Sequence, residues 1–168
     1  GYALPAYADK DTLVIASSHS GNTEETVACM NEAIARGCQM AAIATGGQVK
    51  EIAAAHDIMF AEIPHDTQPR MGMIYNLRVL LRILVEFGLA KKTVYDDLAA
   101  TEAWLHEESD LWVKEMPTER NYAKQLALIA VGKTPVFYGG SLMAPVAYKW
   151  KISWNENAKN VAFWNYLP

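Results

Sequence analysis

Apolar residues in the first half of the chain occur in two kinds of pattern. Short continuous apolar runs predict strands at residues 13–16, 40–44 and 58–63. Between these runs, apolar residues recur every three or four positions, which predicts helices over residues 23–36 and 49–56. Strands that are apolar at nearly every position are typical of a parallel sheet with both faces buried. The alternation of strand and helix therefore predicts an α/β fold with a doubly wound parallel sheet.

A third helix is predicted over residues 71–87, where apolar residues cover more than one narrow stripe. A helix of this kind packs on two sides, either within a core or at a subunit contact, and the pattern leaves both open. Residues 91–119 are rich in acidic side chains. They predict one or two surface helices that end at Pro117 and connect two lobes.

A second unit is predicted after Asn121. It consists of a helix over residues 122–131, a strand over 135–138, a glycine-containing loop and a helix over 144–157. One strand does not complete a doubly wound domain, so we expect the chain to be the middle of a larger two-lobed protein. The expected organisation is a first domain at residues 1–90, a helical connection at 91–119 and the start of a second domain at 120–168.

The loop after the first predicted strand has the composition of an anion-binding site. Ser18 and Ser20 lie ahead of a helix N-terminus, with Gly21 following them. The first N–H groups of a helix have no partner within the helix, and the helix dipole favours negative charge there. Because the loop contains no Lys or Arg, it fits a phosphomonoester held by neutral donors and not a Walker-type nucleotide site. The alternative is a capped helix without a ligand, with Asn22 at the N-cap and Glu25 in the capping-box position.

Three separated segments resemble motifs of one family. Residues 18–26, Ser-His-Ser-Gly-Asn-Thr-Glu-Glu-Thr, resemble the S-x-S-G-N-T-E-E-T loop of sugar isomerase (SIS) domains, specifically of bifunctional phosphoglucose/phosphomannose isomerases. Gln68-Pro69-Arg70 resembles the Q-P-R motif that this family places before a long helix. Residues 150–159 resemble the family's R/K-W-K-x-x-x-N-E-N-A-K signature. The first loop alone is also similar to the T/S-x-T-G-N-T loop with which flavodoxins hold the phosphate of FMN.

The resemblance implies a three-layer αβα fold of SIS (flavodoxin-like) type, with two SIS units that are both incomplete in this chain. It implies that Ser18, Ser20 and Thr23 bind a substrate phosphate, that Arg70 stabilises an enediolate and that Glu156 is the catalytic base. The implied activity is the interconversion of glucose 6-phosphate and mannose 6-phosphate with fructose 6-phosphate through a cis-enediolate. The implied enzyme is a homodimer that needs no metal or organic cofactor. In the family, a histidine thought to open the sugar ring lies in a stretch whose first residue corresponds to Pro168.

The residue types suit these implied roles, and each also has a simpler explanation. A guanidinium stays charged and binds two oxygens at once, although a lone loop residue such as Arg70 is more often only exposed. Trp150 and Trp154 are predicted on one helix face near Glu156, where apolar walls would suit its carboxylate to accept a proton near neutral pH. The simpler explanation of the polar residues around Glu156 is that they end a helix.

Two other functions remain open from the sequence. A non-catalytic SIS module that senses a phosphosugar would keep the serine-rich loop but would need neither Arg70 nor Glu156. An FMN-binding flavodoxin-like protein would explain the loop but not the segments around these two residues.

Composition narrows the function classes further. The chain has 168 residues, of which 51% are hydrophobic, so it has enough apolar surface to bury a core. A net charge of −4 without a basic tract argues against nucleic-acid binding, and no apolar run has the length of a membrane span. Cys29 and Cys38 are too few for a disulfide framework and, without a leader pattern, favour the cytoplasm. The four histidines show no metal-ligand spacing.

Overall fold

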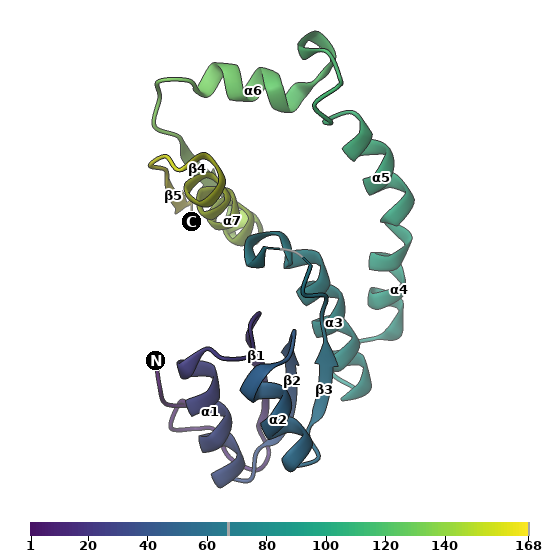
Figure 1. Cartoon of the computed structure of the whole chain (residues 1–168), viewed down its shortest axis with the longest axis vertical. Coiled ribbons are helices and arrows are strands. Elements are labelled where there is room, and N and C mark those ends of the chain that lie inside the picture. Colours follow the sequence, from purple (N-terminus) through teal and green to yellow (C-terminus); the bar gives the residue numbers. More distant parts are fainter. Residues whose placement is uncertain (67, 168) are drawn as a thin grey trace. The chain divides into compact units, whose positions relative to one another are not determined.

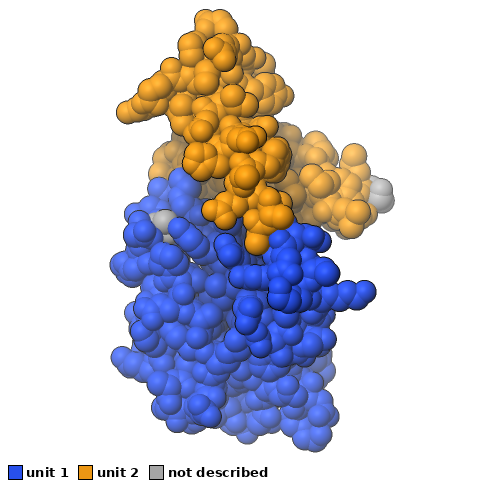
Figure 2. Space-filling model, turned by 90° about the vertical axis from the view of Figure 1, so that its right-hand side faces the viewer, with its two compact units in different colours: residues 1–98 blue, residues 99–168 orange. Residues whose placement is uncertain are grey.

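The computed structural model describes residues 1–66 and 68–167 of the chain. The chain forms two compact units, unit 1 (residues 1–98) and unit 2 (residues 99–168) (Figure 2). Unit 1 contains a three-stranded parallel sheet and unit 2 a two-stranded parallel sheet, which confirms the predicted α/β class. Within the described ranges, no helix has the length and apolar content needed to cross a membrane. Pro168, where the resemblance places the start of a further motif, lies outside the described residues.

The sheet of unit 1 consists of β1 (Leu13–Ser17), β2 (Gln39–Ala44) and β3 (Met59–Glu62), in that order (Figure 1). β1 and β3 pair in parallel with the two edges of β2. Every residue of β2 after the first is buried, because the central strand is covered on both faces. The three predicted strands agree with the observed strands to within one residue at each end.

Helices cover both faces of this sheet. α1 (Glu24–Ala35) and α2 (Gly47–Ala55) pack on one face, and α3 (Met73–Glu86) packs on the other. Alternate residues of β2 enter the two cores, because successive side chains of a strand point to opposite sides. The first core contains Ala16, Met30, Ala33, Met40, Ala42, Ala44, Val49 and Ala53, and the second contains Ala41, Ile43, Ile63 and Ile83. Unit 1 therefore has the predicted three-layer αβα architecture.

The N-terminal segment is held by Glu32 of α1 and by Arg36, the C-cap residue of that helix. Glu32 accepts a hydrogen bond from the N–H of Leu4 at 2.7 Å and forms an ion pair with Arg36. Arg36 in turn donates to the carbonyl oxygens of Pro5 and Ala8, at 2.9 and 3.2 Å. The hydrogen bond from Leu4, and after it the one from Arg36, holds the pKa of the Glu32 carboxyl below its ordinary value of 4.5.

We expect Glu32→Ala to release the N-terminal segment from α1. Because the folded-state pKa of Glu32 is lowered, its stabilising effect is present above pH 4.5 and is lost as the pH falls through the lower folded-state value. The NMR shift of the Leu4 amide should therefore change on acidification below pH 4.5 in the wild-type protein. In Glu32→Ala it should resemble the acid form at every pH. A Leu4 signal that acid leaves unchanged in the wild-type protein would show that Glu32 does not anchor the segment.

Two surface helices, α4 (Lys92–Ala100) and α5 (Glu102–Asp110), follow α3, and the boundary between the units falls inside α4. α5 ends well before Pro117, which corrects the predicted end of this helical region. The chain after α5 is held in turns by Asn121, which is fully buried, and by Lys124. The side-chain nitrogens of both residues donate to backbone carbonyl oxygens of these turns. Side-chain hydrogen bonds to backbone carbonyls therefore hold the chain between α5 and α6.

Unit 2 contains α6 (Tyr122–Ala130), β4 (Val136–Gly139), α7 (Ala144–Ser153) and β5 (Phe163–Tyr166). α7 connects β4 to β5, and the two strands pair in parallel, so they form a β–α–β element. The prediction of a single strand in this unit was wrong. β5 has four residues, three of them exposed, and includes an Asn, so no continuous apolar run marks it in the sequence.

The predicted helix over residues 144–157 consists of two different structures. The regular α-helix α7 ends at Ser153, and the next five residues form a π-helical turn, Trp154–Ala158. Lys159 follows in the left-handed region, with φ of 52°. Single π-helical turns are rare and are frequently found at functional sites.

Candidate active site

Three loops of unit 1 leave the same edge of the sheet, because parallel strands place their carboxyl ends together (Figure 1). Residues 18–23, which we call the serine loop, follow β1 and contact the chain after β2. The N–H of Thr45 donates to the carbonyl oxygen of His19 at 2.9 Å, and the N–H of Val49 to that of Gly21 at 3.0 Å. Open α/β sheets bind their ligands at this edge.

The hydroxyl groups of the serine loop divide into a buried and an exposed set. Ser18 is 5% exposed; its Oγ accepts a hydrogen bond from the N–H of Gly21 at 3.0 Å and shares another with Oγ1 of Thr23 at 2.8 Å. Ser20 and Thr23 are exposed. Oγ of Ser20 accepts from the N–H of Asn22 at 3.2 Å, which leaves the hydroxyl proton for donation to a ligand. Ser18 therefore orients Thr23, while Ser20 and Thr23 carry the accessible hydroxyls.

Asn22 does not cap the helix that follows it, so the capping interpretation of this loop is wrong. The N-cap of α1 is Thr23, whose side chain makes no capping hydrogen bond. Asn22 instead reaches the start of α2, where its Oδ1 accepts from the N–H of Gln48 at 3.1 Å, and its Nδ2 donates to the carbonyl oxygen of Ser20 at 3.3 Å. The N-terminus of α1 thus lies beside two exposed hydroxyls without a side-chain cap, a combination that suits an anion.

The segment that carries Arg70 lies immediately before α3, on a 3-10 turn over Pro69–Met71, and Arg70 is half-buried. This segment approaches the serine loop through Gly72, which follows the turn. A Cβ atom at Gly72 would be in van der Waals contact with His19, 3.6 Å from its Nδ1. That nitrogen is buried and has no hydrogen-bond partner among the described residues. Unit 1 therefore brings together two segments that are far apart in the sequence. No sequence signal singled out His19, which occupies the variable position of the S-x-S motif.

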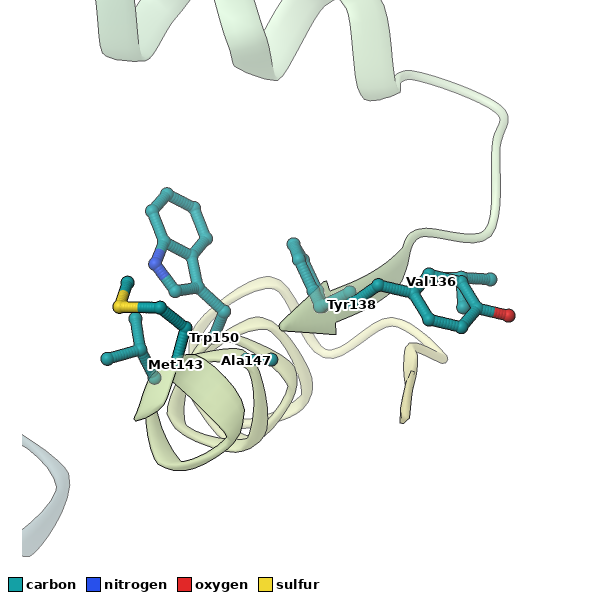
Figure 3. A pocket seen from close by; sticks show the side chains of 7 residues that line it. Val136, Tyr138, Met143, Ala147 and Trp150 are labelled. Carbon is teal, nitrogen blue, oxygen red and sulfur yellow. The ribbon is translucent and has the colours of Figure 1, made fainter. Parts of the chain in front are cut away.

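Glu156 is the central residue of the π-helical turn in unit 2, and its side chain is exposed. Trp150 and Trp154 share a helix face as predicted, but this face packs on β4. Their ring centroids lie 5.7 and 6.2 Å from that of Phe137. Figure 3 shows Trp150 in a groove lined also by Val136, Tyr138, Met143 and Ala147. The two indoles pack the helix on β4 through Phe137, while the side chain of Glu156 is exposed.

The predicted site residues are thus divided between the two units. Unit 1 carries Ser18, Ser20, Thr23 and Arg70, and unit 2 carries Glu156. In chemical terms, unit 1 supplies neutral donors and a permanent cation, and unit 2 supplies a carboxylate that can exchange a proton.

Comparison with known proteins identifies the family. Residues 119–168 match the family described as bacterial phospho-glucose isomerase C-terminal SIS domain. The bifunctional phosphoglucose/phosphomannose isomerase of Caldicellulosiruptor bescii is 41% identical over 165 residues, which cover 98% of this chain and 48% of that protein. The protein of the same name from Aquifex aeolicus is 34% identical over 167 residues, which cover 99% of this chain and 48% of that protein. The chain spans about half the length of the curated relatives it matches.

Solved structures agree on the fold. The crystal structure of tagatose-6-phosphate ketose/aldose isomerase from Escherichia coli matches with a TM-score of 0.62 and 18% identity, over 95% of this chain and 44% of that chain. At this identity, the likeness concerns the fold alone. The sequence identity to the two relatives and the match to the family model show that the chain belongs to the SIS-domain family of bifunctional phosphoglucose/phosphomannose isomerases.

Proposed function

We propose that the full-length protein is an aldose–ketose isomerase that interconverts glucose 6-phosphate and mannose 6-phosphate with fructose 6-phosphate. The observation that carries the proposal is the meeting, in unit 1, of an uncapped helix N-terminus, exposed hydroxyls and the segment before α3. An anion site next to the segment that carries Arg70 suits a substrate with a phosphate at one end and a reacting carbonyl at the other. The names of the relatives support the choice of hexose 6-phosphates.

In the proposed complex, the phosphate is held by the serine loop. Ser20 and Thr23 donate their hydroxyl protons to phosphate oxygens, together with first-turn N–H groups of α1. Ser18 contributes through its hydrogen bond to Thr23, which fixes the direction of that hydroxyl. Binding by neutral donors leaves the positive charge of Arg70 for the reacting end of the sugar.

The proposed chemistry is a proton transfer between two neighbouring carbons. Glu156 removes the proton from C2 of the open-chain aldose, and the electrons of that C–H bond form the C1–C2 double bond of a cis-enediolate while the carbonyl oxygen becomes negative. Arg70 stabilises this charge with a fork of N–H donors. The hydroxyl proton on O2 then passes to O1, the carboxyl group of Glu156 returns its proton to C1, and the C2–O2 bond becomes the carbonyl of the ketose. Because C2 is planar in the enediolate, the same base serves glucose and mannose 6-phosphates.

We also propose that the working protein is a homodimer. α3 buries Ile83 on the sheet, but Met73, Ile74, Tyr75 and Leu77 at its other end are 39–47% exposed. Four half-exposed apolar side chains within five residues at one helix end suit an interaction site. The pairing of α3 with a second copy would cover it.

A coupled assay of the full-length protein with both hexose 6-phosphates tests the proposed function directly. Turnover of both sugars at comparable rates would support it. Binding without turnover would instead indicate a phosphosugar sensor, and co-purified flavin would indicate an FMN protein.

We expect Ser20→Ala to weaken binding of both sugars alike. The substitution removes one hydrogen bond to a charged group, on the order of 1.5–3 kcal/mol, or about 10- to 100-fold in affinity. Calorimetric titration with each 6-phosphosugar measures the loss. Ser109→Ala is the matched control, since that exposed serine lies in α5, where its hydroxyl donates to the carbonyl oxygen of His106 at 2.8 Å. If Ser20→Ala bound as tightly as the control, the serine loop would have no role in holding phosphate.

A further inference from the structure

The π-helical turn around Glu156 is held at both ends by side-chain amides. Nδ2 of Asn157 donates to the carbonyl oxygen of Ser153, the last residue of α7, at 2.9 Å. Nδ2 of Asn155 donates to the carbonyl oxygen of Asn160, beyond the turn, at 2.9 Å. The two bonds therefore run in opposite directions from the two residues that flank Glu156.

The chemistry of these bonds requires an amide at each position. Both partners are carbonyl oxygens, which accept only, so each side chain must present its NH₂ group to the backbone. A carboxylate of the same shape would place an acceptor against an acceptor. An amide is also neutral over the pH range in which a carboxylate titrates, so the two neighbours hold the turn without competing for a proton.

The π-helical turn sets the orientation of the Glu156 side chain relative to α7. An α-helix rotates by about 100° per residue, so the wider π-helical turn gives the residues after Ser153 a different orientation from that of a continued α-helix. Lys159 then adopts the left-handed conformation, which ends the turn before β5. Loss of either amide bond would allow this segment to relax toward regular α-helix or to fray.

We infer that Asn155 and Asn157 are positioning residues that fix the carboxylate of Glu156 for proton transfer by clamping the π-helical turn from both sides. The inference rests on the proposed role of Glu156 as the base. The three residues then have separate functions. The carboxylate of Glu156 transfers the proton, and the two amides hold the orientation of that carboxylate. Polar residues that merely end a helix in solvent would not need these two bonds, which start from the two neighbours of Glu156 and run to carbonyl oxygens before and after it in the chain.

The test uses Asn155→Asp and Asn157→Asp in the full-length protein, with fructose 6-phosphate as substrate. Misplacement of a reacting group by about 1 Å costs roughly 100-fold in rate, so we expect kcat to fall by about that factor in each variant. KM should stay nearly unchanged, because the proposed phosphate contacts lie in unit 1. Asn157→Ala, which removes the amide without adding charge, should show a similar fall in kcat. A role in stability alone would lower the melting temperature and leave the kcat of the folded protein intact.

Asn160→Asp is the matched control. Oδ1 of Asn160 accepts from the N–H of Val161 at 2.8 Å, a bond that an aspartate retains, so this variant adds the same charge nearby without losing a donor. The inference is overturned if Asn155→Asp and Asn157→Asp keep the kcat of Asn160→Asp, or if Asn157→Ala is fully active. Glu156→Gln separates this failure from failure of the proposed function. If Glu156→Gln is inactive and the asparagine variants are active, only the inferred role of the two asparagines is overturned. If Glu156→Gln is active, the proposed role of Glu156 as the base is overturned as well.

Discussion

Glu156→Gln is expected to abolish isomerisation of both sugars while leaving phosphosugar binding nearly intact. The amide keeps the size of the carboxylate but does not accept a proton at neutral pH, and general bases contribute about 100- to 10,000-fold in rate. The activities with glucose and mannose 6-phosphates should fall together, because one base serves both. Affinity should persist, because the proposed phosphate contacts belong to the serine loop.

Exchange of the C2 proton of glucose 6-phosphate with solvent deuterium measures this step most directly. It reports removal of the proton whether or not the sugar goes on to product. Glu107→Gln is a suitable control, since this exposed carboxylate lies in α5 and outside the proposed site. If Glu156→Gln exchanged the C2 proton at the wild-type rate, the base would be another residue.

Gly21→Ala is expected to destabilise unit 1 by about 3–5 kcal/mol, from strain and overpacking together. Gly21 has φ of +72°, a conformation that residues with a Cβ rarely adopt. A Cβ at this position would lie 1.8 Å from the carbonyl oxygen of Gly46, so the two loops would have to separate. The hydrogen bond from Val49 to Gly21 and the bond from Gly21 to Ser18 would be strained with them.

Gly37→Ala provides the control for this prediction. Gly37 has a similar φ of +69°, but a Cβ there would meet no atom within 4 Å. Gly37→Ala should cost only the backbone strain, about 1–2 kcal/mol. The two variants share the backbone strain, so the difference between their midpoints of urea denaturation measures the destabilisation caused by the clash with Gly46. Equal midpoints would show that the serine loop does not depend on contact with Gly46.

The elements that were predicted correctly are those with a local pattern of apolar residues in the sequence. β1, β2 and β3 were found from apolar runs, most clearly β2, because a strand covered on both faces is apolar at nearly every position. β5 was missed for the opposite reason: it is short and mostly exposed, and only its pairing with β4 makes it a strand. The helix after β4 was predicted, but its change to a π-helical turn at Trp154 was not, since the spacing of apolar residues does not record which carbonyl each N–H meets.

The sequence by itself determined the α/β class, the position of the serine loop before a helix, and the three motifs that lead to the family. Tertiary structure decided what each polar side chain contacts. The alternative interpretation of the loop placed Asn22 as the cap of α1, but its Oδ1 accepts from the N–H of Gln48, 26 positions away, at the start of another helix. Ser18 is buried and Ser20 is exposed, although both belong to one motif. Sequence patterns record burial and helical spacing because these repeat locally, whereas hydrogen-bond partners are chosen only when distant segments meet.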